Sequence, residues 1–123
     1  MNKSVRLRKQ GKFYCSYEED AYVMYSIFNY KISNGKVGFP LEVLGKVTNT
    51  LDSNKVNYVV IENDNEITKK TFPKNNYSKY LSDGKKTFKV LKYEEELIDK
   101  IKELPMDKIE KIINYIKEVI HEW

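Results

Sequence analysis

The run over residues 56–62 constrains the fold more than any other part of the chain, because it joins β-branched and aromatic side chains almost without a break. Such a run is typical of a strand buried inside a sheet, and we expect it to be the central strand. Apolar residues at helical spacing precede it and predict a helix over residues 41–51. They are Leu41, Leu44, Val47 and Leu51. Helices alternating with strands are typical of an α/β fold.

The N-terminal segment over residues 4–16 predicts extended chain. Its apolar and basic side chains alternate, and Gly11 marks a turn or bulge that splits the segment or shifts its register. The alternation predicts one face with Val5, Leu7, Phe13 and Cys15, and an opposite face with Arg6, Arg8 and Lys12.

A helix and a short strand are predicted next. Residues 17–30 carry an apolar stripe at helical spacing, with Ser16 as the expected N-cap and acidic residues in the first turn. Residues 31–37 predict a short strand interrupted by a turn at Asn34-Gly35. Pro40 suits the first turn of the following helix.

The C-terminal half predicts a hairpin, a loop and then helices. Residues 66–72 are expected to pair back on residues 56–62, residues 73–86 to form a loop, and residues 87–91 to form another strand. Helical spacing begins at Tyr93, breaks at Pro105 and resumes in a stronger stripe. That stripe consists of Ile109, Ile112, Ile113, Ile116, Val119 and Ile120.

The predicted architecture is therefore α/β: a small mixed β-sheet flanked by helices, with a C-terminal helical hairpin. We expect an α/β domain over residues 1–92 and a helical extension over residues 93–123. The apolar stripe of that extension has two interpretations: it packs on the domain, or it forms a homodimer.

Composition narrows the class of protein. A chain of 123 residues fits one domain. Its single cysteine allows no internal disulfide, and no apolar run is long enough to span a membrane. The basic N-terminus lacks the apolar stretch of a signal peptide, so we expect a cytoplasmic protein without a membrane partner.

Catalytic signatures are missing from the sequence, so we expect no enzyme, no cofactor and no metal. The sole histidine, His121, is expected to be solvated near the C-terminus, and Cys15 to be a buried strand residue rather than a nucleophile. The acidic residues Glu18, Glu19 and Asp20 could hold a metal, but at the start of a helix they are expected to stabilise its dipole. No phosphate-binding loop or dinucleotide fingerprint is present.

Two basic stretches point to nucleic acid, in keeping with a net charge of +4. Lysine and arginine bind phosphates, and interleaved aromatic rings can stack on bases. The alternative is a solvated surface with no ligand. The candidate binding residues are Arg6, Arg8, Lys9, Lys12, Phe13, Tyr14, Lys69, Lys70, Lys85 and Lys86.

Residues 11–21 read Gly-Lys-Phe-Tyr-Cys-Ser-Tyr-Glu-Glu-Asp-Ala. This stretch resembles the opening of the N-terminal, mismatch-recognition domain of MutS proteins, where a Gly-Asp-Phe-Tyr-Glu strand leads into a helix with an acidic-Asp-Ala start. Gly38-Phe39-Pro40 resembles the family's Gly-Val/Ile-Pro, and the helix and strand expected over residues 44–51 and 56–62 agree in order. The resemblance covers residues 4–72.

The resemblance implies the MutS domain I fold and a stacking aromatic. Phe13 matches the aromatic of the family's Phe-x-Glu motif, which stacks on a mispaired base. Cys15 replaces the glutamate and Lys12 replaces the usual aspartate, and a thiol is a poorer hydrogen-bond acceptor than a carboxylate. The chain is also too short to carry the ATPase, lever and clamp parts of MutS.

We therefore expect a non-enzymatic module that binds DNA or RNA, in a small bacterial or phage protein that is a monomer or a homodimer through its C-terminal helix. The alternative is a small phage- or plasmid-type regulatory protein that acts by binding a host protein. Small size, missing catalytic groups and the apolar C-terminal helix favour that alternative.

Overall fold

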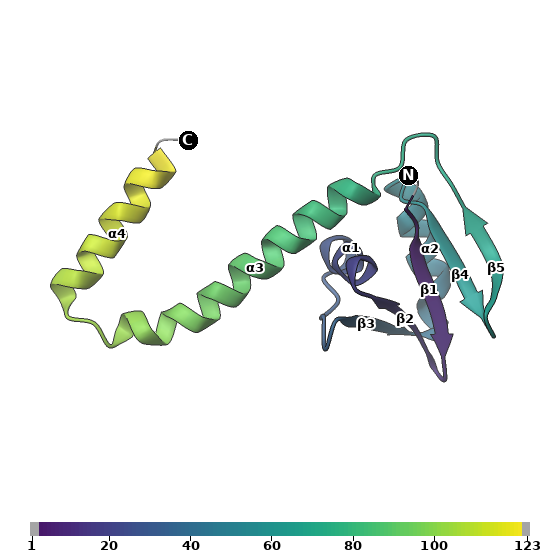
Figure 1. Cartoon of the computed structure of the whole chain (residues 1–123), viewed down its shortest axis with the longest axis horizontal. Helices are drawn as coiled ribbons and strands as arrows, with labels where there is room; N and C mark the ends of the chain where they lie inside the picture. The colour runs from purple at the N-terminus through teal and green to yellow at the C-terminus, as the bar shows by residue number, and fades with distance from the viewer. Residues whose placement is uncertain (1–2, 122–123) are drawn as a thin grey trace. The chain divides into compact units, whose positions relative to one another are not determined.

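The computed structural model describes residues 3–121, and the chain divides into two compact units, Met1–Phe88 and Lys89–Trp123. The first unit contains a five-stranded sheet with the order β3-β2-β1-β4-β5. Figure 1 labels its strands and α-helices, and the 3-10 helix precedes α2. The elements are β1 (Val5–Gln10), β2 (Phe13–Tyr17), α1 (Glu19–Phe28), β3 (Lys36–Pro40), the 3-10 helix η1 (Leu41–Val43), α2 (Leu44–Ser53), β4 (Tyr58–Glu62), β5 (Asn65–Lys70) and the beginning of α3 (Tyr77–Lys102).

The sheet is mixed. Strand β1 runs parallel to β4, whereas the β1–β2, β2–β3 and β4–β5 pairs are antiparallel. Strand β4 is an interior strand, as its apolar run predicts, but the middle of the sheet is occupied by β1. The predicted α/β class, a small mixed sheet flanked by helices, is confirmed.

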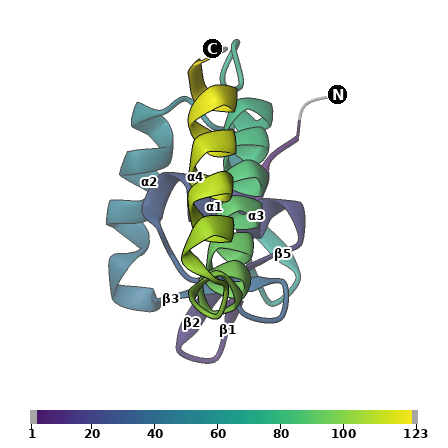
Figure 2. The same ribbon diagram turned by 90° about the vertical axis from the view of Figure 1, so that its left-hand side faces the viewer.

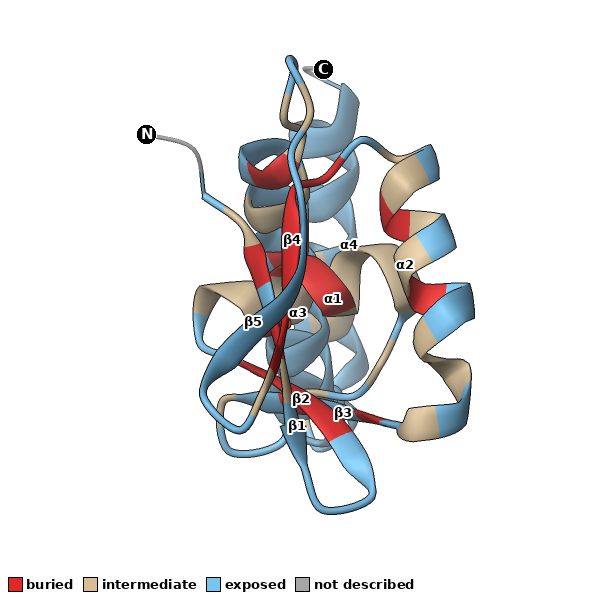
Figure 3. Ribbon diagram, turned by 90° about the vertical axis from the view of Figure 1, so that its right-hand side faces the viewer, coloured by how far each residue is buried: buried red, intermediate tan, exposed pale blue. Residues whose placement is uncertain are grey.

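Helices α1 and α2 cover the same face of this sheet (Figures 1 and 2). Their buried residues form one apolar cluster with alternate residues of β1, β2, β3 and β4. Figure 3 shows burial concentrated in β4, α1 and the inner turns of α2, whereas edge strand β5 is exposed throughout. The core residues include Val5, Leu7, Tyr14, Val23, Met24, Val37, Phe39, Val47, Leu51 and Val60.

The register of the β1–β2 hairpin corrects one prediction from the sequence. Only Gly11 and Lys12 connect the strands, and Gln10 pairs with Phe13. Paired residues point to the same side of a sheet, so Phe13 and Cys15 lie opposite Leu7 rather than beside it. The prediction that they share the face of Val5 and Leu7 is wrong, because the two-residue turn shifts the alternation by one position.

Two other boundaries differ from the predictions. Ser16 lies in β2 and does not cap α1, which begins at Glu19 with no side-chain cap. The strand expected over residues 31–37 begins only after the turn at Asn34-Gly35 and extends to Pro40. Pro40 is tolerated in β3 because β3 is an edge strand, so no further strand needs the N–H group that proline lacks.

Helix α3 is the largest departure from the sequence predictions. The loop expected over residues 73–86 gives way to helix at Tyr77, and the strand expected over residues 87–91 is helical. Asn75 starts the helix, because its side-chain oxygen accepts the N–H of Tyr77 at 3.2 Å. Tertiary packing then overrides local propensity: the ring of Phe88 lies edge-on to those of Tyr22 and Tyr25 in α1.

The second unit contains the end of α3 and helix α4 (Met106–His121). The predicted break at Pro105 is confirmed, and the Pro105 carbonyl accepts the N–H groups of Lys108 and Ile109. Apolar residues of α4 are exposed, among them Ile113, Ile116 and Ile120. Packing against the domain or dimerisation through this helix stays a prediction. Within residues 3–121, no helix combines the length and the apolarity that crossing a membrane requires.

Gly84 allows α3 to approach α1, and its replacement tests that contact. A Cβ at Gly84 would lie 2.2 Å from the carbonyl oxygen of Tyr22. We expect Gly84→Ala to lower the free energy of unfolding by about 1–3 kcal/mol, because the helices must separate to relieve the clash. Urea unfolding measures the loss.

The matched control is Gly45→Ala in α2. A Cβ at Gly45 would meet nothing within 4 Å, so alanine should leave the stability unchanged or raise it slightly. Equal losses at the two glycines would contradict the close helix contact.

Candidate nucleic-acid interface

One face of the sheet carries no helix in the first unit. The side chains of β1 that alternate with Val5 and Leu7 point away from α1 and α2, and their cross-strand partners point the same way. We call this side the open face. Its polar and aromatic residues are Arg6, Arg8 and Gln10 of β1, Phe13 and Tyr17 of β2, Lys36 of β3, and Glu66 and Lys69 of β5.

The middle of the open face is apolar and shielded. Cys15 and Val59 are each 4% exposed and Ile61 is 8% exposed, although none belongs to the helix-covered core cluster. Long neighbouring side chains on adjacent strands can shield such positions without a covering helix. The open face is thus an apolar floor bordered by cations and aromatic rings.

Phe13 stands at the hairpin end of the open face. Its side chain is 50% exposed, and the adjacent turn is formed by Gly11, with φ of 61°, and Lys12. The Lys12 carbonyl accepts the N–H of Leu41 at 3.2 Å, which attaches the turn to η1. A firmly held aromatic ring in solvent is suited to stacking or to acting as a wedge.

Two basic residues lie near this ring. Arg8 is on the same face of the hairpin and Lys12 is in the turn, whereas Lys9 pairs with Tyr14 and points to the opposite face. Within residues 3–121, the recorded ion pairs involve none of these three cations and not Arg6. The hairpin therefore presents uncompensated positive charge next to Phe13.

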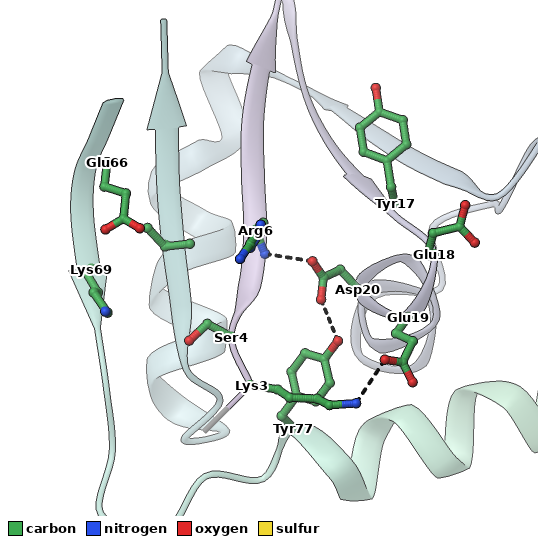
Figure 4. A pocket seen from close by; sticks show the side chains of 11 residues that line it. Lys3, Ser4, Arg6, Tyr17, Glu18, Glu19, Asp20, Glu66, Lys69 and Tyr77 are labelled. Atoms are coloured by element: carbon green, nitrogen blue, oxygen red, sulfur yellow. Dashed lines mark hydrogen bonds and ion pairs between the residues drawn. The ribbon is translucent and has the colours of Figure 1, made fainter. Parts of the chain in front are cut away.

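A pocket of about 470 Å³ opens on the same face, away from the hairpin tip. Figure 4 shows Arg6 in its middle, Glu66 and Lys69 of β5 on one side, and Asp20 and Tyr17 on the other. Its remaining residues are Lys3, Ser4, Glu18, Glu19, Val59 and Tyr77.

Asp20 fixes the wall of this pocket. Its carboxylate accepts the backbone N–H of Arg6 at 3.1 Å and the hydroxyl of Tyr77 at 2.5 Å. The Ser16 hydroxyl donates to the Arg6 carbonyl at 2.9 Å. The β1–β2 ladder ends at Arg8, so these side chains satisfy the peptide groups of β1 where β2 departs.

Burial has the largest effect on the pKa values of Asp20 and Tyr77. It raises the pKa of Asp20, although hydrogen bonds from Tyr77 and from the Arg6 backbone act in the opposite direction. Burial and the bond to Asp20 also raise the pKa of Tyr77 well above its ordinary range. Tyr77 therefore stays protonated and continues to donate to Asp20.

Tyr14 is not available for stacking, which corrects its place among the candidate binding residues. Its side chain is 4% exposed, stacks on Phe39 and donates its hydroxyl to Glu62. Burial, together with the Glu62 carboxylate, raises the pKa of Tyr14 to about 12. Successive side chains of a strand point to opposite faces, so Tyr14 points into the core and Phe13 points to the open face.

The four lysines predicted from the second basic stretch lie in different places. Lys69 lines the pocket on the open face. Lys70 points to the helix-covered side, lies 4.0 Å from Asp52 and contacts the ring of Phe72. Lys85 is 3.7 Å from Glu19, and Lys86 is exposed on α3. Only Lys69 joins Arg6, Arg8 and Phe13 on one surface.

Tyr17 and Lys36 also lie on the open face, although neither is among the candidate residues predicted from the sequence. Tyr17 was expected to begin a helix, but it closes β2 and pairs with Lys36. Its side chain is 37% exposed, and its hydroxyl donates to the Gln10 side chain at 2.6 Å. The alternation from Phe13 through Cys15 to Tyr17 was the available signal, and it fits a strand that continues to Tyr17.

The groups considered for catalysis do not converge. Cys15 is buried, and among the described residues no three His, Cys, Asp or Glu side chains are arranged to hold a metal ion. Glu19 is instead paired with Lys3 at 2.9 Å, and this bond lowers its pKa. His121 lies at the end of α4, in the second unit.

We expect Asp20→Ala to lower the free energy of unfolding by about 1–3 kcal/mol, because the Arg6 N–H and the Tyr77 hydroxyl lose their acceptor. Tyr77→Phe should cost less in the Asp20→Ala background than alone, and urea unfolding of the four proteins measures this coupling. Glu19→Ala is the control, since its ion pairs are exposed and it should change stability little. Additive losses at Asp20 and Tyr77 would contradict the coupling.

Comparison with known proteins assigns no family to this fold. No protein-family model matches the chain, and no curated protein matches it. The function must therefore be inferred from the residues and geometry of the open face and its hairpin.

Proposed function

We propose that this protein is a non-enzymatic nucleic-acid-binding module, and that the β1–β2 hairpin is its primary contact. The observation that carries the proposal is the half-exposed ring of Phe13 beside a two-residue turn, with Arg8 on the same face and Lys12 in the turn. An exposed aromatic ring close to cations combines the groups that stack on bases and pair with phosphates. Phosphates would pair with the cations, and Phe13 would stack on a base or wedge between two.

The shape of the hairpin supports the same function. Strand β4 pairs with β1 only as far as Arg8, so the turn and the last residues of β1 extend past β4, whereas β3 pairs with β2 up to Phe13. The end of the hairpin, rather than the whole ribbon, could approach the major groove of duplex DNA, which is about 12 Å wide. The attachment of Lys12 to Leu41 pre-organises the tip and reduces the entropy that binding costs. The resemblance to the MutS N-terminal domain agrees, because Phe13 occupies the position of that family's stacking aromatic.

Regulation by binding a host protein is the second candidate function. The exposed apolar residues of α4 favour it, because a helix in water usually buries such a stripe. This surface lies in the second unit and is independent of the hairpin. A protein partner that remains bound after nuclease treatment, and is lost on Ile116→Asp, would support this candidate.

Fluorescence anisotropy with labelled DNA tests the hairpin. Phe13→Ala should weaken binding about fivefold to 100-fold, because a stacked ring contributes roughly 1–3 kcal/mol. Tyr115→Ala is the matched control, since it removes an exposed aromatic ring from α4, outside the first unit. Equal effects of the two variants would contradict a role for the hairpin.

Salt dependence tests the phosphate contacts. If Arg6, Arg8, Lys9 and Lys12 each neutralise one phosphate, affinity for duplex DNA should fall roughly 100-fold when salt rises fourfold. Arg8→Ala should make the dependence of log affinity on log salt shallower by about one unit. Binding that is unchanged across this range, or no binding at low salt, would refute the proposed function.

A further inference from the structure

The open face presents a row of side chains that crosses the whole sheet. Lys69 of β5 pairs with Val59 of β4, and Val59 pairs with Arg6 of β1. On the far side, Tyr17 of β2 pairs with Lys36 of β3. Strand β2 leaves β1 beyond the Arg8–Cys15 pair, and the pocket that both Arg6 and Tyr17 line lies at this opening. Three cations, one aromatic ring and one aliphatic residue therefore share this row.

The width of the row decides which nucleic acid it can take. Four strand spacings separate β3 from β5, which is about 19 Å at the usual 4.8 Å per spacing. That exceeds the roughly 12 Å width of the major groove, so the face cannot approach a duplex there as the end of the hairpin could. A single strand has no groove to enter, and its unpaired bases expose the faces on which aromatic rings stack.

Charge complementarity also favours a polyanion on this face. The strands contribute four cations to this face, Arg6, Arg8, Lys36 and Lys69, and one carboxylate, that of Glu66. Three more acids line the pocket: Asp20 accepts two hydrogen bonds and Glu19 pairs with Lys3 and Lys85, whereas Glu18 adds a second carboxylate to this face. The row therefore has excess positive charge that phosphates would neutralise.

The pocket and the Tyr17 ring lie along this row. The pocket of about 470 Å³ includes Lys69, Arg6 and Tyr17, and a volume of this order is typical of sites for small organic groups such as a nucleotide. The bond from the Tyr17 hydroxyl to the Gln10 side chain holds its ring in place. A ring fixed in this way loses little entropy when a base stacks on it.

We propose that the open face binds single-stranded nucleic acid, with the strand crossing from β5 to β3, phosphates on Lys69, Arg6 and Lys36, and a base on Tyr17. This inference rests on the proposed function and adds the class of ligand and a second surface. The hairpin contacts nucleic acid at Phe13, whereas the row around Tyr17 selects an unpaired strand.

The test compares three labelled probes of one sequence by fluorescence anisotropy: a DNA single strand of about 12 nucleotides, the same strand as RNA, and the DNA duplex. The full chain should bind one or both single strands more tightly than the duplex. Tyr17→Ala should weaken single-strand binding about fivefold to thirtyfold, whereas Tyr17→Phe, which keeps the ring, should retain it. Lys36→Glu should also weaken it, and this exposed edge residue leaves the core intact.

The outcomes separate this inference from the proposed function. Duplex binding that equals or exceeds single-strand binding, with Phe13→Ala impaired and Tyr17→Ala and Lys36→Glu unaffected, overturns the inference and leaves the hairpin function in place. No binding of any probe at low salt overturns both. Preference for the RNA strand or for the DNA strand identifies the natural ligand, because the 2′-hydroxyl is the group that differs. Circular dichroism and urea unfolding confirm that each variant is folded.

Discussion

The parallel pairing of β1 with β4 is the interaction on which the rest of the first unit depends. It joins the hairpin strands β1 and β2, with α1 and β3, to the second hairpin of β4 and β5, with α2. Val5 pairs with Tyr58 and Leu7 with Val60, and these four residues form the floor on which both helices pack. Parallel strands need a long crossover connection, and here the connection contains both helices. The helices consequently share one face, and the other face is left open.

The open face depends on how the backbone hydrogen bonds of β1 are completed where β2 ends its pairing with it. Where β2 leaves β1, the Ser16 hydroxyl and the Asp20 carboxylate take over the hydrogen bonds of the Arg6 peptide groups. The same departure creates the pocket between α1 and the open face. Ser16 and Asp20 thus also position Arg6. Because they bond to its peptide groups, no covering helix is needed to satisfy the hydrogen bonds at this edge of β1.

The two surfaces proposed for nucleic acid differ in shape. The hairpin tip is narrow and is attached to η1 through the Lys12 carbonyl. The row through Arg6 is broad and lies beside the buried strand β4. A binding module with both would combine a wedge with a platform.

Hydrophobic periodicity and proline chemistry are local properties of the chain. They were therefore enough to predict the α/β class, the buried strand over residues 56–62 and the break at Pro105. The basic and aromatic character of the hairpin is likewise visible in the sequence. The sequence did not determine which way Phe13, Tyr14 and Tyr17 point, since a two-residue turn reverses the alternation and the register is fixed only when strands pair. The sequence also did not predict that a helix begins at Tyr77. Gly84 and Phe88 favour this helix only through their contacts with α1, which the sequence does not reveal. Only the tertiary structure placed Arg6, Tyr17, Lys36 and Lys69 in one row, because these residues come from four strands and cross-strand neighbours are set by long-range pairing.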